Sequence, residues 1–108
     1  MNNDAKWIIE IFQLQLAALR KELSNPKIRR DKFDKYSYSS WAIVETLLAI
    51  DDYSGYVTVG LIREILTLQL LDYESYYNRN KERHIKYKYA HDMIENLLEL
   101  IGGWNYDE

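Results

Sequence analysis

The sequence predicts an all-α protein, an antiparallel four-helix bundle with helices at about residues 4–24, 40–51, 58–77 and 81–101. Its length of 108 residues suits one domain, so we expect residues 1–108 to form a single helical domain. One proline and four glycines leave few breaks, which favours long helices over the frequent turns of a β-sandwich. Apolar residues also recur at three- and four-residue steps, the period of an amphipathic helix.

The first helix is predicted from a long apolar stripe. Its members are Ile8, Phe12, Leu16, Leu19 and Leu23, widened by Trp7, Ile11, Leu14 and Ala18. We expect Asn3 or Asp4 to cap its N-terminus. Asn25-Pro26 should end it, because the residue before a proline is pushed out of the α region. Trp7, Trp41 and the helical leucines are the expected core.

Residues 25–38 show no clean period and mix charged with aromatic side chains. We expect a long charged loop here between the first two helices. A connection of this length is either a functional loop or hides a short helical turn near residues 31–35. The second helix should begin at Ser39 or Ser40. Its expected apolar side consists of Trp41, Val44, Leu47 and Leu48.

The last two segments are strongly periodic and predict the third and fourth helices. Thr58 should cap the third, whose stripe consists of Ile62, Ile65, Leu66, Leu70, Tyr73 and Tyr77. The fourth carries Ala90, Met93, Ile94, Leu97, Leu98 and Ile101, and Gly102-Gly103 should end it. Between them, Asn78 and Asn80 are expected as C-cap and N-cap of a tight corner.

Several classes of function are excluded or disfavoured by composition. The absence of cysteine excludes disulfides, thiolate zinc sites and cysteine nucleophiles. Residues 1–7 hold Asp4 beside Lys6, and Glu10 interrupts the apolar run that follows, so neither a signal peptide nor a spanning helix is predicted. We expect a cytoplasmic protein that does not contact a membrane.

Metal and catalytic motifs are weak. His84 and His91 lie seven residues apart, on nearly one helix face, with Glu95 one turn beyond. Lys88 stands between the histidines, and neither H-E-x-x-H nor E-x-x-H occurs. No glycine-rich phosphate loop, nucleophile elbow or Ser/His/Asp arrangement can be assembled. We therefore expect no metal, no cofactor and no catalytic residues, so an enzyme is the less favoured class.

Basic residues gather in two stretches although the net charge is −3. Residues 20–35 hold seven Lys/Arg against three Asp/Glu, and residues 79–88 hold five against one. If these stretches lie side by side, they would form a patch that attracts phosphate, and nucleic acid would bind through residues 27–35 and 79–88. The alternative is a pair of solvated faces.

Tyrosines near the second stretch indicate a binding surface. Tyrosine combines a large apolar ring with a polar hydroxyl group, which suits partly solvated interfaces. Beside Arg or Lys, tyrosine also suits stacking on unpaired bases. The alternative is a bundle that uses tyrosine as the outer rim of its core. The candidate binding residues are Tyr73, Tyr76, Tyr77, Arg79, Arg83, Tyr87, Arg29 and Arg30.

The segment RNKERH, residues 79–84, resembles the R-x4-6-H signature of HEPN domains, which are small all-α bundles, many of them dimeric metal-independent ribonucleases. The resemblance covers these six residues. It implies that Arg79 steadies the charge developing on a scissile phosphate while His84 acts as general acid or base. A helix corner must separate the pair, because a five-residue step in one continuous helix turns side chains about 140° apart.

Together these features predict a non-catalytic helical interaction protein that binds a macromolecular partner, above all another protein. By analogy, small regulators and inhibitors from bacterial mobile elements have this character. We also expect a homodimer that buries tyrosine and leucine side chains of the third or fourth helix. The alternative function is a HEPN-like ribonuclease or RNA-binding module that uses Arg79 and His84.

Overall fold

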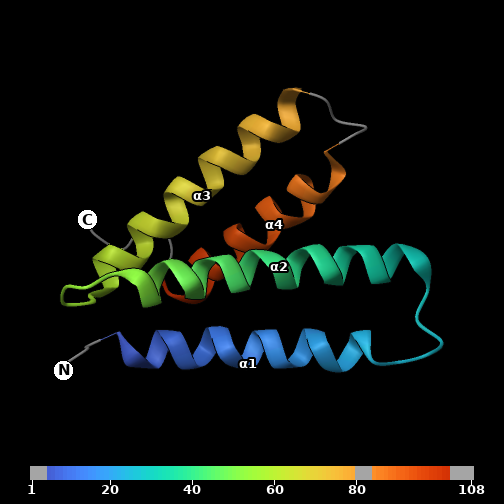
Figure 1. The fold of residues 1–108 in the computed structure, drawn as a ribbon, viewed down its shortest axis with the longest axis horizontal. Helices are drawn as coiled ribbons and strands as arrows, with labels where there is room; N and C mark the ends of the chain where they lie inside the picture. Colours follow the sequence, from blue (N-terminus) through green and yellow to red (C-terminus); the bar gives the residue numbers. More distant parts are fainter. Residues whose placement is uncertain (1–4, 80–83, 103–108) are drawn as a thin grey trace.

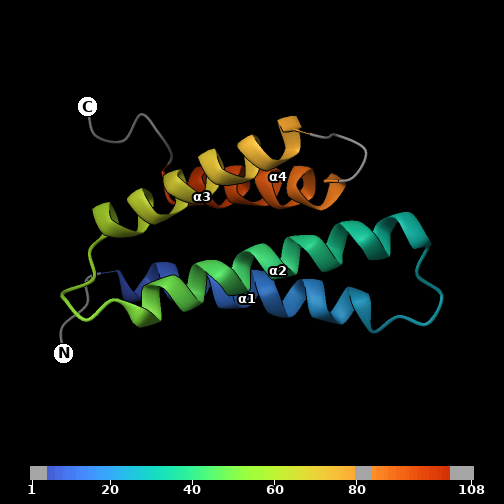
Figure 2. The same ribbon diagram turned by 45° about the horizontal axis from the view of Figure 1, so that its top comes forward.

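Helices account for most of the described chain. The computed structural model describes residues 5–79 and 84–102, and within these ranges there are four helices: α1 (Lys6–Leu23), α2 (Arg30–Asp52), α3 (Val59–Arg79) and α4 (Ile85–Leu100). Figure 1 shows consecutive helices running antiparallel, and Figure 2 shows α1 and α2 below the α3–α4 pair. The predicted all-α four-helix architecture is confirmed. No helix in these ranges is long and apolar enough to cross a membrane.

The helix α2 lies in the middle of the assembly, with α1 along one side and the α3–α4 pair on the other (Figure 1). Its buried residues are Ser39, Ala42, Ile43, Thr46 and Ile50. Of the predicted apolar side, Trp41, Val44 and Leu47 are half-buried against the margin of the core, whereas Leu48 is exposed, so the centre of the buried face was predicted wrongly. A helix with neighbours on both sides places small and branched residues at the closest contacts, so its bulkiest residues do not mark its buried face.

The helix α1 packs mainly against α2 and buries the narrow stripe Ile8, Phe12 and Leu16. These members of the predicted stripe are confirmed. Trp7 and Leu14 are exposed, which corrects the expectation of Trp7 in the core. A helix with one close neighbour buries only one stripe, so residues beside that stripe are half-buried, as Ile11 is, or exposed. Ala5 takes the N-cap position, and Asn3 and Asp4 lie outside the described residues.

The predicted long loop at residues 25–38 was wrong, because residues 30–38 belong to α2. The alternative of a helical turn near residues 31–35 corresponds to the first turns of this helix. Asp31 lies in the first turn of α2, where its negative charge stabilises the helix by interacting with the positive end of the helix dipole. Farther along, the ring of Tyr38 stacks on Tyr89 of α4, with centroids 6.4 Å apart. This contact with α4 stabilises the helical conformation of residues 30–38, whose sequence shows no regular spacing of apolar residues.

The pair α3 and α4 follows the predicted periodicity. The Thr58 hydroxyl caps α3 as expected, since its Oγ1 accepts a hydrogen bond from the Leu61 N–H at 3.0 Å. The helix α3 buries Ile62, Leu66 and Tyr73, and α4 buries Ala90, Ile94, Leu97 and Leu98. Gly102 follows α4 with a φ of 96°, in the left-handed region that favours glycine.

A corner separates α3 from α4, but it differs in detail from the predicted one. The helix α3 continues to Arg79, so Asn78 lies in its last turn and not at the C-cap. The helix α4 begins at Ile85, with His84 at its N-cap. Asn80, the predicted N-cap, lies outside the described residues. The separation of the two helices therefore agrees with the prediction, whereas the positions of their ends do not.

Candidate functional site

Aromatic rings from α2, α3 and α4 gather close to the α3–α4 corner. We call Trp41, Tyr73, Tyr76 and Tyr87 the aromatic cluster. The Tyr87 ring centroid lies 6.0 Å from that of Trp41, 5.9 Å from Tyr73 and 4.8 Å from Tyr76. The rings of Trp41 and Tyr73 are 5.5 Å apart. These separations are typical of favourable aromatic pairs, so the cluster joins the three helices.

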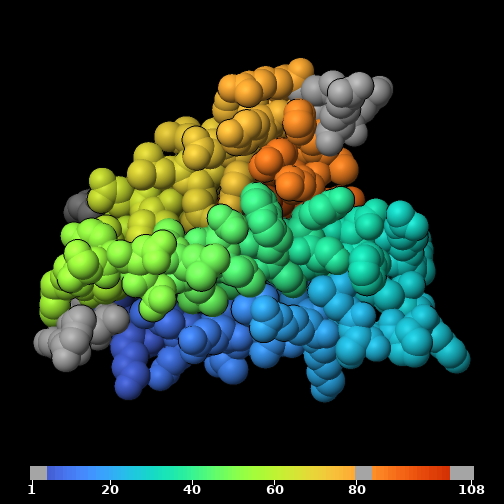
Figure 3. All heavy atoms as spheres, viewed as in Figure 1, coloured from blue at the N-terminus to red at the C-terminus, as the bar shows by residue number. Residues whose placement is uncertain are grey.

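A groove of about 330 Å³ lies over this cluster. Its lining comprises the aromatic cluster together with Glu45, Ala49, Gln69 and Asp72. Figure 3 shows a face of the molecule on which the atoms of α2, α3 and α4 adjoin. Tyr73 is buried while Glu45 and Asp72 are exposed, so the groove combines an aromatic floor with an acidic rim.

Hydrogen bonds fix the polar end of Tyr73 beneath the groove. Thr46 Oγ1 donates to Gln69 Oε1 at 2.7 Å, and Gln69 Nε2 donates to the Tyr73 hydroxyl oxygen at 3.1 Å. Burial raises the pKa of Tyr73 above its usual value. The Gln69 hydrogen bond lowers this pKa in part, and the negative charges of Glu45 and Asp72 raise it. The phenol therefore stays neutral at physiological pH, and its oxygen accepts the hydrogen bond from Gln69 beneath the groove.

Cationic side chains lie against the aromatic cluster. The Lys86 ammonium nitrogen is 4.7 Å from the Trp41 ring centroid and 5.1 Å from that of Tyr87. The Arg79 guanidinium carbon is 5.2 Å from the centroid of Tyr76. These distances fall within the range of about 6 Å over which ring faces attract cations.

The structure brings some of the predicted binding residues together and separates others. Tyr73, Tyr76, Tyr87 and Arg79 lie in or beside the aromatic cluster. Tyr77 instead lines a groove between α3 and α4 with Lys88 and His91. Arg29 and Arg30 lie at the start of α2, and Arg83 is outside the described residues.

Sequence patterns missed Trp41 as a site residue and did not single out Glu45 or Asp72. A usable signal was present, because Trp41 and Glu45 are four residues apart in α2, and Asp72 and Tyr76 are four apart in α3. Residues at this spacing share a helix face. What the spacing could not show is that the two faces meet.

The described residues of the two basic stretches lie toward the same end of the molecule, where α2 begins and where α3 ends and α4 begins (Figures 1 and 2). Ion pairs neutralise part of their charge. Arg29 pairs with Asp31 at 3.2 Å, Arg30 with Asp34 at 3.5 Å, and Lys88 with Asp92 at 3.2 Å. A single phosphate-binding patch stays a prediction.

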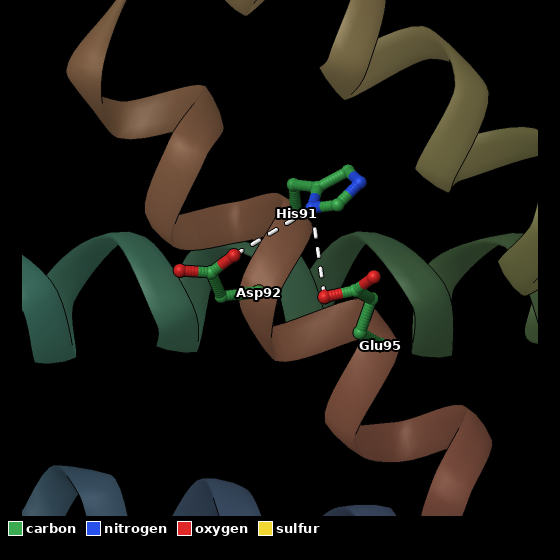
Figure 4. A group of neighbouring side chains, drawn as sticks. All are labelled: His91, Asp92 and Glu95. Carbon is green, nitrogen blue, oxygen red and sulfur yellow. Dashed lines mark ion pairs between the residues drawn. The ribbon is translucent and has the colours of Figure 1, made fainter.

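A second polar cluster, His91, Asp92 and Glu95, lies on α4 (Figure 4). His91 Nδ1 is 3.6 Å from Asp92 Oδ1 and 3.9 Å from Glu95 Oε1. The other predicted imidazole, His84, lies against Tyr87. The Lys88 ammonium donates to Asp92, which raises the pKa of Lys88. A metal ion here would compete with that ammonium for the Asp92 carboxylate.

The groove over the aromatic cluster is accordingly the candidate functional site, because it combines exposed aromatic surface, charge and rigid support. No family model, curated protein or solved structure matches this chain. The function of the site is therefore inferred from its own geometry and chemistry.

Proposed function

We propose that this protein is a non-catalytic interaction protein that binds another protein through the aromatic cluster and its groove. The observation that carries the proposal is the convergence of aromatic side chains from three helices on one surface groove. Tyrosine and tryptophan dominate the energetics of many protein interfaces because each buries a large area. A regulator or inhibitor of this kind acts by covering or stabilising a surface of its partner.

The contacts that hold the side chains of the site in place support this function. Tyr76 is partly exposed, yet its ring is stacked on Tyr87, and Tyr73 is fixed by Gln69. A surface that is ordered before binding loses less side-chain entropy when a partner docks. The aromatic cluster is therefore suited to act as the anchor of an interface.

Replacing Tyr76 with alanine should weaken capture of the partner about tenfold or more, because the stacked ring would leave the centre of the interface. The measurement is affinity purification from the native host, quantified by mass spectrometry, with wild type and variant immobilised at equal density. Tyr56→Ala is the matched control, since Tyr56 is 48% exposed and Tyr76 41% exposed, and Tyr56 does not line the groove. Equal recovery by wild type and Tyr76→Ala would contradict the proposal.

Assembly into a homodimer is part of the proposed function. Leu68 and Leu71 of α3 are 59% and 57% exposed and lie on one face, because residues three apart are neighbours on a helix. This face is turned away from the buried residues Ile62 and Leu66. Exposed apolar side chains that adjoin one another favour an interface, and a two-fold dimer would cover the same pair in both copies.

A metal-independent ribonuclease is the alternative function, favoured by the arrangement of Arg79 and His84. Arg79 lies over Tyr76, the His84 and Tyr87 centroids are 5.5 Å apart, and the two tyrosine rings stack. The helix corner that the HEPN resemblance requires is present, since α3 ends at Arg79 and α4 begins at Ile85. In this alternative, Arg79 stabilises charge on the phosphate and His84 transfers the proton.

For an interaction protein, purified wild type should not cleave single-stranded RNA in EDTA above the level of Arg79→Ala and His84→Ala. The measurement is gel analysis of a labelled RNA, with Arg20→Ala as a control for an exposed arginine elsewhere. Cleavage by wild type and Arg20→Ala that either site variant abolishes, with an unchanged circular dichroism spectrum, would put the ribonuclease function first.

A further inference from the structure

We propose that the groove over the aromatic cluster is a cation site that receives a lysine side chain of the protein partner. The inference rests on the proposed function and specifies the chemistry of the partner. It follows from the aromatic floor, from the charge of the rim and from the cation that the chain itself places on the rings.

The floor of the groove attracts cations through the electron-rich faces of its rings. Trp41 and Tyr87 hold the ammonium of Lys86 at 4.7 Å and 5.1 Å from their centroids, so these rings already take an alkylammonium group. Tyr73 and Tyr76 extend the same aromatic lining along the groove. A second ammonium that entered the groove would meet ring surface of the same kind.

The rim supplies two carboxylates that form no ion pair with another described residue. Glu45 and Asp72 line the groove, and no ion pair joins either carboxylate to another residue within 5–79 and 84–102. Asp31, Asp34 and Asp92, in contrast, each pair with a basic residue close by in sequence. The charges of both rim carboxylates also raise the pKa of Tyr73 on the floor, less than burial does.

The shape and charge of the groove favour a basic side chain over an acidic or an apolar one, and the ammonium of Lys86 on the same rings is the reason for choosing lysine. Its volume of about 330 Å³ suits a single extended side chain better than a helix. An acidic side chain would be repelled by Glu45 and Asp72, and a purely apolar one would desolvate these carboxylates without compensation. A lysine can lay its methylene groups along the rings while its ammonium approaches the rim.

Lys86 is the internal competitor of this ligand. Its ammonium lies on two rings of the aromatic cluster without lining the groove, so its charge repels a second cation that approaches the same rings. Removing its charge should therefore strengthen lysine binding, whereas removing charge from the rim should weaken it. These opposite signs distinguish a cation site from a generally apolar groove.

The test is a titration of the isotope-labelled full chain with a capped pentapeptide that carries lysine between glycines, followed through the indole N–H resonance of Trp41. The same peptide with norleucine, which has the lysine methylene chain without the ammonium, is the control ligand. We expect a saturable shift with the lysine peptide and no comparable shift with the norleucine peptide. The resonance is assigned with Trp41→Phe.

Substitutions then identify the groups that bind. Glu45→Gln combined with Asp72→Asn should weaken the lysine peptide roughly three- to tenfold, and Lys86→Met should strengthen it roughly two- to threefold. Glu22→Gln combined with Glu64→Gln removes two exposed carboxylates outside the groove and should leave binding unchanged.

An absent Trp41 shift, or an equal shift with norleucine, would overturn the inference. Because the titration uses only the protein and a peptide, its failure is separate from failure of the proposed function. Partner capture that depends on Tyr76 would still support protein binding if the lysine peptide did not bind.

Discussion

Replacing Phe12 with alanine should lower the free energy of unfolding by about 3–5 kcal/mol, the loss expected for a fully buried aromatic side chain. The Phe12 ring is 0% exposed, on the stripe of α1 that packs against α2. The side chains around Phe12 can fill the resulting cavity only in part, as is general for large-to-small substitutions in a packed core. Urea denaturation followed by circular dichroism measures the change.

The matched control is Leu14→Ala, two residues farther along the same helix. Leu14 was predicted from the sequence to widen the buried stripe, but its side chain is 70% exposed. We expect this substitution to change the free energy of unfolding by no more than about 0.5 kcal/mol. Losses of equal size at Phe12 and Leu14 would contradict the orientation of α1.

Introducing glutamate at both Leu68 and Leu71 should convert the proposed homodimer to a monomer. The substitutions remove apolar contact area and place like charges opposite one another across a two-fold axis. We expect the dimer to weaken by at least about a hundredfold. Multi-angle light scattering at tens of micromolar should then report the monomer mass for the variant and twice that mass for wild type.

A control for this experiment is Leu14→Glu combined with Leu48→Glu, which charges exposed leucines of α1 and α2. This variant should stay dimeric. A strictly monomeric wild type at the same concentration would contradict the dimer itself. Dissociation by the control variant, with a persistent dimer in the α3 variant, would move the interface to the α1–α2 side.

Helices with regular amphipathic stripes were predictable in detail. The buried residues of α4 were all anticipated, and Thr58 was identified as a cap from its residue type and position. The stripe of α1 was anticipated at Ile8, Phe12 and Leu16 but drawn too wide. Periodicity reports that a helix has an apolar face, whereas the number of its neighbours decides how much of that face is buried.

The candidate site was only partly predictable. The concentration of tyrosine and arginine near the α3–α4 corner predicted a binding surface there. Trp41 was assigned to the core, however, and Glu45 and Asp72 were not singled out. These residues form a site with Tyr76 and Tyr87 only because α2 lies beside α3 and α4, a relation between segments distant in sequence.

The sequence by itself determined the helical class, the approximate positions of the helices and the buried stripes of α3 and α4, because these depend on residue spacing within one segment. Tertiary structure decided that residues 30–38 extend α2 and that Ala42 and Ile43 face the core. It also decided that rings from three helices meet around Tyr87. These outcomes depend on the energy of contacts between helices, which cannot be read from the spacing of residues within a single helix.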